Sequence, residues 1–257
     1  MPHVPVLLHE AIAYLAPKPG DFIIDGTVGG GGHAKAIAEK IAPGGMLLGV
    51  DWDKEMVKKI TLNLKRKTCS VIFVHGNYAD ISEILRKRKL PKANGLLLDL
   101  GFSSEQIATR GRGFSFMHNE PLLMTYDDSR EPVKALLRRI REDELADILF
   151  TFGEERYARR IAKEIKAEER RGKIETTGVL VRVIERAVPN RYAHSRLNPA
   201  TRTFQALRIY ANDELGNLER ALRSLGEVLA SGGRAVIVSF HSLEDRLVKN
   251  YFKTFGK

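Results

Sequence analysis

The sequence predicts an α/β fold, in which a doubly wound parallel sheet of about five strands is interrupted by an all-helical insertion. Short apolar segments alternate with amphipathic segments over residues 21–101. This alternation is typical of a parallel sheet with helices on both faces. The alternation stops after about Ser103 and returns only near the C-terminus, which predicts the insertion.

Four buried strands are expected before the insertion, each a short apolar run. They are residues 21–25, 46–51, 71–78 and 95–101. Amphipathic helices are expected between them at residues 33–41, 53–64 and 80–90.

The insertion is expected to be helical and to have its own small core. Tyr157, Ile161 and Ile165 are four residues apart and form one apolar stripe. A second helix has threonines as caps at its start and stops at Pro189. We therefore assign residues 105–197 to the insertion and residues 1–104 and 198–257 to the sheet domain.

The sheet domain is expected to resume with one long helix over residues 198–229, capped by Asn198 with Pro199 in its first turn. A fifth parallel strand over 232–240 and a last helix from Ser242 to about Phe252 follow.

The stretch DGTVGGGGHA, from Asp25 to Ala34, raises the question of function, because four consecutive glycines are costly in backbone entropy. Strand, glycine loop and helix form a nucleotide-binding arrangement, in which the ligand approaches backbone N–H groups at the helix start. Asp51 ends the next expected strand, where a carboxylate can accept both hydroxyls of a ribose. The structural alternative is a glycine-rich turn without a ligand.

Two ligand classes compete for this loop. A dinucleotide favours the pattern G-x-G-x-x-G, with which DGTVGGGGH aligns poorly. S-adenosylmethionine carries no phosphate and has a zwitterionic amino acid end, so it can use an acid in the first loop, here Asp25. The residues therefore favour S-adenosylmethionine.

The fourth expected strand ends in DLGF, which places Asp99 near the donor methyl group. Amino-group methylases often combine an acid or amide with an aromatic residue three positions later. Asp99 and Phe102 have that spacing without the usual prolines, and core packing is an equal alternative for Phe102.

The bulk composition narrows the class of protein. The chain of 257 residues has a formal net charge of +10, which favours a polyanion such as nucleic acid over a merely basic surface. Cys69 is the single cysteine, so an intrachain disulfide is excluded. No run approaches the roughly 18 apolar residues of a membrane span, and we expect a soluble cytoplasmic protein without membrane association.

Taken together, the motifs resemble one family over nearly the whole chain, in order. They are HVPVLLHEAI, DGTVGGGGHA, GVDWD, LLLDLGFSSEQI, RGRGFSF, GEERYARRIA, NPATRTFQALRIYANDEL and SFHSLEDRLVK. They resemble the bacterial ribosomal RNA small-subunit methyltransferase H family, also called MraW. The resemblance implies a Rossmann-like class I S-adenosylmethionine-dependent methyltransferase. The implied reaction is methylation of the exocyclic N4 of a cytidine at the decoding centre of 16S ribosomal RNA.

The resemblance also implies a set of cofactor contacts. By motif, these are Gly31, Gly32, His33, Asp51, Tyr78, Asp99 and Gln106. Spacing alone would leave His33 as a surface residue at a helix start and Tyr78 as a packing residue at a strand end. After RGFSF the chain has Leu123 and Thr125 where the family usually has an acid and an arginine, so these two positions are not assigned to the site.

The chemistry and the partner follow from the resemblance. Asp99 is the candidate to accept a hydrogen bond from the N4 amino group, and His241 could contact the base or receive the proton, although a structural role for His241 is slightly favoured. No metal is expected, because the histidines and the lone cysteine show no ligand spacing. RNA contacts are expected from arginines in residues 182–208, unless these form only a solvated basic face. These arginines, with interleaved Tyr192, His194 and Phe204, are Arg182, Arg186, Arg191, Arg196, Arg202 and Arg208.

A methyltransferase sheet of this type usually ends in a hairpin of two further strands, for which residues 253–257 are too few. We therefore expect the strand order 3-2-1-4-5, with the fifth strand at an edge. The last helix, a second copy in a homodimer or residues beyond this sequence would have to cover that edge. Two other classes stay open, a nicotinamide-dependent oxidoreductase and an RNA-binding module with a degenerate cofactor site.

Overall fold

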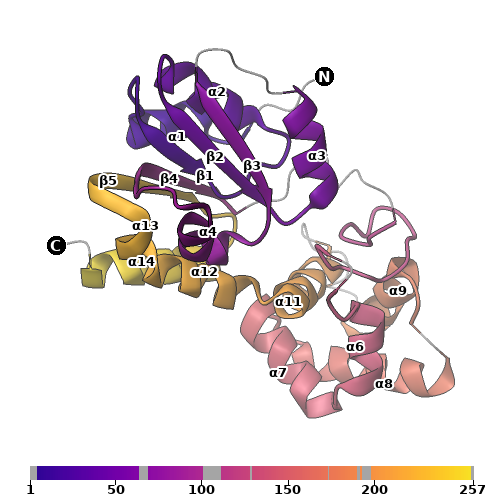
Figure 1. Ribbon diagram of the computed structural model, residues 1–257. Helices are drawn as coiled ribbons and strands as arrows, with labels where there is room; N and C mark the ends of the chain where they lie inside the picture. The colour runs from indigo at the N-terminus through magenta and orange to yellow at the C-terminus, as the bar shows by residue number, and fades with distance from the viewer. Residues whose placement is uncertain are drawn as a thin grey trace. The chain divides into compact units, whose positions relative to one another are not determined.

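The computed structural model describes residues 5–63, 69–100, 111–127, 129–172, 174–189, 192 and 198–255. The chain divides into two compact units (Figure 1). Unit 1 comprises Met1–Glu105 and Leu215–Lys257, and unit 2 comprises Gln106–Glu214. No helix within the described ranges is both long enough and apolar enough to cross a membrane.

Unit 1 is built on a five-stranded parallel sheet in the order β3-β2-β1-β4-β5. The expected fold class and strand order are therefore confirmed. The strands are β1 (Phe22–Asp25), β2 (Met46–Asp51), β3 (Ser70–His75), β4 (Ala93–Asp99) and β5 (Leu229–Val238). The helices of this part of the chain are α1 (Leu8–Leu15), α2 (Gly32–Ile41), α3 (Lys54–Asn63), η1 (Tyr78–Asp80), α4 (Ile81–Arg88), α12 (Glu214–Arg223), α13 (Leu225–Val228) and α14 (Ser242–Phe255).

Each face of the sheet is covered by its own set of helices (Figure 1). On one face, α1, α2 and α3 pack with residues such as Ile23 and Leu47. On the other face, α4, α12, α13 and α14 pack with Ile24 and Leu48. Successive residues of a strand point to opposite faces, so an uninterrupted apolar run is what a sheet covered on both sides requires.

Several predicted boundaries shift, one of them because of turn chemistry that the apolar pattern does not record. The third strand ends at His75 rather than at Tyr78, since the Asn77 side chain accepts a hydrogen bond from the Ala79 N–H and starts a 3₁₀ turn. The fifth strand is Leu229–Val238 rather than 232–240. Helix α1 was not anticipated from the sequence.

The C-terminal part of unit 1 agrees with expectation. Residues 242–255 form the helix α14, so the prediction that no further strand follows β5 is confirmed for the described residues. Leu247 and Val248 of α14 pack against the same core cluster as Ile237 of the edge strand β5. The Arg234 side chain of β5 also donates a hydrogen bond to the Tyr14 carbonyl of α1 (3.0 Å). The homodimer stays a prediction.

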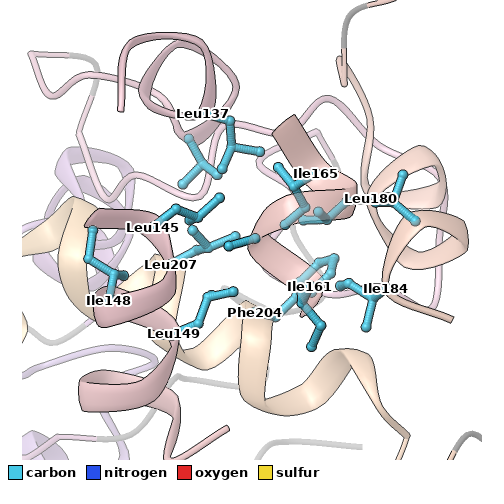
Figure 2. Packing of buried hydrophobic residues seen from close by; sticks show 14 of the residues in the cluster. Leu137, Leu145, Ile148, Leu149, Ile161, Ile165, Leu180, Ile184, Phe204 and Leu207 are labelled. Atoms are coloured by element: carbon cyan, nitrogen blue, oxygen red, sulfur yellow. The ribbon is translucent and has the colours of Figure 1, made fainter. Parts of the chain in front are cut away.

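Unit 2 is helical, as predicted, and has a separate apolar core. Its helices are α6 (Val133–Arg139), α7 (Glu142–Gly153), α8 (Ala158–Arg171), α9 (Thr177–Ala187) and α11 (Ala200–Asn212). Figure 2 shows Ile161 and Ile165 of α8 packed with Leu145, Phe204 and Leu207, which confirms the apolar stripe. Within its described residues the unit's β structure is one isolated bridge, Pro121 with Thr176.

One long helix after residue 198 is not what forms, and this prediction was wrong. Three helices, α11, α12 and α13, occupy the segment. Asp213 has φ 51°, in the left-handed region that ends a helix. The preceding Asn212 is fully buried, and its amide donates to the Met124 carbonyl while accepting from the Tyr126 N–H. A tertiary contact thus decides where the helix ends.

That break also explains why the contacts place α11 in unit 2, whereas the sequence boundary at 197/198 places it with the sheet. Two caps differ in detail as well. Asn198 does cap, because its side chain accepts from the Ala200 N–H (2.8 Å). Thr176 at the start of α9 makes no side-chain cap, and the Thr177 hydroxyl instead donates to the His118 carbonyl.

Candidate functional site

The carboxyl ends of the first four strands of unit 1 all carry a titratable side chain. They are Asp25, Asp51, His75 and Asp99, and Val238 of β5 pairs with Asp99 in register. Ligands of open parallel sheets bind beside these ends. The glycine loop between β1 and α2 leaves the same edge.

Asp51 is buried, and its side chain anchors the glycine loop. Its Oδ2 accepts a hydrogen bond from the Gly29 N–H (2.7 Å), and its Oδ1 accepts from the Asp53 N–H (2.8 Å). Each carboxylate oxygen can accept a second hydrogen bond. The side chain therefore fixes the loop while keeping the capacity to accept ribose hydroxyls.

The glycines of the loop are required by the protein's own packing as well as by any ligand. Gly31 has φ 82°, a conformation that favours glycine, and a Cβ there would overlap the Cδ1 atom of Ile60 on α3. A Cβ on Gly32 would overlap the ring of Pro5. These contacts join residues far apart in the sequence, so the glycine run by itself indicates only the approach of a ligand.

Asp25 is fully buried at the end of β1. Its Oδ1 accepts from the Thr27 N–H (3.1 Å), whereas no described residue donates a hydrogen bond to its Oδ2. Desolvation by burial is the main reason why the pKa of this carboxyl is raised to about 7. The charges of Asp99 and Asp51 contribute to the same rise, and the Thr27 hydrogen bond opposes it. A buried carboxyl with an open acceptor is suited to a cationic group of a ligand.

Asp99 is held at the end of β4 by its backbone. Its N–H donates to the Thr27 hydroxyl (2.6 Å), which ties the strand end to the glycine loop. Its Oδ2 lies 3.6 Å from Nδ1 of His33, a buried residue in the first turn of α2. The structure thus places His33 beside Asp99. Spacing alone favours a surface position for His33, and that alternative is wrong.

An aromatic pair lies beyond Asp51. The rings of Trp52 and Tyr78 stack with centroids 5.7 Å apart and planes 22° apart. The His75 ring bonds the Trp52 carbonyl through Nε2 (2.9 Å). Sequence reasoning missed Trp52, although its place directly after the strand-end acid was a usable signal. A flat apolar surface beside a ribose acceptor is suited to an adenine ring.

His241 lies at the same edge of the sheet but is engaged in a capping box. Glu244, at the third position of α14, accepts from the Phe240 N–H (2.8 Å). The His241 Nε2 is 3.1 Å from the Glu244 carboxylate, and its Nδ1 faces the Glu244 N–H at 3.4 Å. The His241 ring therefore lies against the start of α14, and its buried Nε2 makes no hydrogen bond among the described residues.

The expected RNA contacts are distributed over unit 2. Arg182 and Arg186 are exposed on α9, and Arg186 pairs with Glu168 (2.6 Å). Arg202 on α11 donates to the Glu154 carbonyl (2.7 Å), and Arg208 is paired with Glu214 (2.8 Å). Arg191, Arg196 and the proposed cofactor contact Gln106 lie outside the described residues, as do Phe102 and His194.

The site fits S-adenosylmethionine better than a dinucleotide. Three carboxylates, Asp25, Asp51 and Asp99, surround the loop, where they would repel a pyrophosphate and attract a sulfonium and an ammonium group. The open Oδ2 of Asp25 is a ready acceptor for the ammonium group. Asp51 and the Trp52–Tyr78 pair offer complementary chemistry for the ribose and the adenine.

Comparison with known proteins agrees with this assessment. The proteins named "Ribosomal RNA small subunit methyltransferase H" of Geotalea uraniireducens (strain Rf4) and Pelobacter propionicus (strain DSM 2379 / NBRC 103807 / OttBd1) are each 46% identical over 256 residues, which is 99% of this chain and 82% of either relative. A solved Aeropyrum pernix fibrillarin with natively bound S-adenosyl-L-methionine aligns with 39% of this chain and 44% of its own, at 23% identity and a TM-score of 0.30. That value is too low to support an argument.

The family model described as the MraW methylase family matches residues 1–257, the whole chain. With the five-stranded sheet, the glycine loop and the acidic strand ends already established, this match excludes the nicotinamide-dependent oxidoreductase. The chain belongs to the MraW methylase family and is an S-adenosylmethionine-dependent methyltransferase.

Proposed function

We propose that this protein methylates the exocyclic N4 of a cytidine in 16S ribosomal RNA of the small subunit. The relatives named for small-subunit RNA methylation cover almost all of the chain, and the net charge of +10 suits an RNA substrate. The observation that carries the choice of an amino group is Asp99, a carboxylate at the end of β4 whose backbone is held by Thr27 and whose Oδ2 lies 3.6 Å from the His33 ring. We place the protein in the cytoplasm, where the RNA is.

The reaction needs help at the nitrogen, because the N4 lone pair is delocalised into the cytosine ring. Bound S-adenosylmethionine would supply a methyl group on a sulfonium sulfur: transfer breaks the S–CH₃ bond, forms an N4–CH₃ bond, leaves a neutral thioether and releases one N4 proton to water. Asp99 accepts a hydrogen bond from the N4 amino group, which orients the nitrogen and stabilises the positive charge that develops on it.

Other residues of the edge position Asp99 and the methyl donor. His33 faces the second oxygen of Asp99 and holds its orientation. Asp25, Asp51, Tyr78 and the loop residues Gly31 and Gly32 bind the donor. His241 is a positioning residue in this scheme, since its Nδ1 accepts from the Glu244 N–H at the start of α14.

Unit 2 is proposed to recognise the RNA. It carries the exposed arginines Arg182 and Arg186 and the half-exposed Arg202. The target cytidine must be unstacked to reach a methyl donor, because the reacting atom of a stacked, paired base is out of reach.

The experiment is a transfer assay with a product-specific readout. The purified protein is incubated with labelled S-adenosylmethionine and either transcribed 16S RNA or isolated small subunits, and the RNA is digested to nucleosides for mass spectrometry. N4-methylcytidine is expected and should be missing from the RNA of a deletion strain. A label on carbon 5 or on a ribose would contradict the N4 assignment, and no label in either substrate would contradict the RNA assignment.

A further inference from the structure

A buried carboxylate organises the start of α8 in unit 2. Glu155 has no exposed surface, and its two oxygens accept different donors. Oε1 accepts from the Tyr157 N–H (2.8 Å), and Oε2 accepts from the Tyr192 hydroxyl (2.9 Å). The two tyrosines, 35 positions apart in the sequence, are thereby fixed side by side, with ring centroids 4.9 Å apart.

An arginine covers both rings. The Arg156 guanidinium carbon lies 5.0 Å from the centroid of Tyr157 and 4.6 Å from that of Tyr192. Arg160 adds a longer contact with Tyr157 at 6.0 Å. Arg156 is exposed, so one face of its planar guanidinium is available for a second stacking contact.

The cations around this arginine are not neutralised. Arg156, Arg159, Arg160 and Lys163 are all exposed, and none of the four has an ion-pair partner among the described residues. Some other basic side chains of unit 2 differ, since Arg138, Arg139 and Arg186 are paired with glutamates. We call the set Arg156, Tyr157, Arg159, Arg160, Lys163 and Tyr192 the Arg–Tyr patch.

We propose that the Arg–Tyr patch binds single-stranded RNA, with an unpaired base stacked on the outer face of Arg156 and the flanking phosphates on Arg159, Arg160 and Lys163. This inference rests on the proposed function, whose RNA-binding unit it makes specific. A rigid arginine–tyrosine platform with unpaired cations beside it is the combination that single-stranded nucleic acid requires.

The chemistry separates RNA from other polyanions. A surface that held only phosphates would need charge and no aromatic platform, and Lys would serve as well as Arg at position 156. The platform also adjoins a residue already expected to contact RNA, because Arg202 donates to the carbonyl of Glu154, next to Glu155.

The test compares Arg156→Lys with Arg171→Ala, using fluorescence anisotropy of a labelled single-stranded oligoadenylate. Arg156→Lys keeps the charge and removes the plane, so RNA affinity should fall about tenfold while the salt dependence stays unchanged. Arg171, exposed at the far end of the same helix, is the matched control, and its variant should bind as the wild type does. Arg159→Ala with Arg160→Ala should reduce the salt slope by about 1.4, because each phosphate contact on a single strand contributes about 0.7.

Thermal unfolding shows whether each variant is folded, and inorganic polyphosphate serves as a competitor without bases. Wild-type RNA affinity in Arg156→Lys would overturn the proposal that the patch binds RNA. Equal losses of RNA affinity in Arg156→Lys and Arg171→Ala, with polyphosphate competing as well as unlabelled RNA, would overturn it too. If the patch variants bind RNA with wild-type affinity while the wild-type protein forms N4-methylcytidine, the proposed function stands and only this inference fails. A wild type that neither binds nor methylates RNA would overturn both.

Discussion

The Nδ1 atom of His33 lies 3.6 Å from the Oδ2 atom of Asp99, so the first turn of α2 meets the end of β4 at the edge of the sheet. The Asp99 backbone is fixed independently by Thr27. One oxygen of Asp99 therefore faces the first turn of α2, and the strand end that carries it is held by Thr27 of the same unit.

Replacing Asp99 with Asn should reduce the rate of methyl transfer far more than it weakens RNA binding. The amide keeps the shape and loses the charge that stabilises the amine in the transition state, and positioned acceptors of this kind contribute about a hundredfold or more. Single-turnover kinetics with saturating donor measures the rate, and calorimetry measures donor affinity. A variant in which donor affinity alone changes would reduce Asp99 to a binding residue.

Cofactor binding should depend on pH through Asp25. Its pKa of about 7 means that the carboxyl is mostly protonated below pH 7 and ionised above it. A cationic ligand requires the ionised form, so affinity should rise up to about tenfold from pH 6 to pH 8, with proton release on binding below pH 7. Calorimetry in buffers of different ionisation enthalpy measures both. Asp25→Asn should remove the dependence attributable to this group, and an identical pH profile in that variant would assign it elsewhere.

Replacing Gly31 with Ala should impair cofactor binding and lower the melting temperature. Gly31 has φ 82°, and the Cβ of an alanine at this position would overlap the Ile60 side chain. Gly20 is the matched control, since it has φ 86° with no atom near an added Cβ. Both variants carry the left-handed penalty of about 1–2 kcal/mol, so the excess loss in Gly31→Ala measures the loop contact. Equal melting temperatures with normal donor binding in both variants would contradict this account of the loop.

The sheet could be predicted because its determinants are local. Apolar runs, helix periodicity and the rules of strand connection specify β1 to β5 and their order. The end of α11 could not be predicted, because the helical pattern of the sequence continues through Asp213. The helix ends there because Asn212 is buried against Met124 and Tyr126.

The same distinction holds for the site. The positions of Asp51 and Asp99 were predictable, since the carboxyl ends of all strands in a parallel sheet lie at the same edge. The position of His33 beside Asp99, the packing of Ile60 on Gly31 and the stacking of Trp52 on Tyr78 join separate elements of unit 1. No local pattern records such contacts, and for His33 only the family resemblance indicated a role.

Replacing Asp51 with Ala should lower donor affinity at least tenfold, because hydrogen bonds from ribose hydroxyls to a charged acceptor contribute about 1.5–3 kcal/mol each. It should also lower stability, since the Gly29 N–H loses its acceptor. Asp53→Ala is the control: its side chain caps the start of α3 by accepting from Glu55 and Met56, so stability should fall and affinity should not. Calorimetry measures the donor affinity of both variants. Unchanged affinity in Asp51→Ala would show that Asp51 does not bind the donor.

Donor binding should change the fluorescence of Trp52, which is the single tryptophan of the chain. The ring is stacked on Tyr78 and follows Asp51 directly, so an adenine bound beside the pair alters the surroundings of the indole and quenches its emission. Titration with S-adenosylmethionine should give a saturable signal whose midpoint agrees with the calorimetric affinity. Tyr78→Leu should weaken the affinity several-fold, whereas Tyr14→Leu, at an exposed position on α1, should leave it unchanged. If the emission is insensitive to donor at saturating concentration, the adenine lies away from Trp52 and this end of the site must be reassigned.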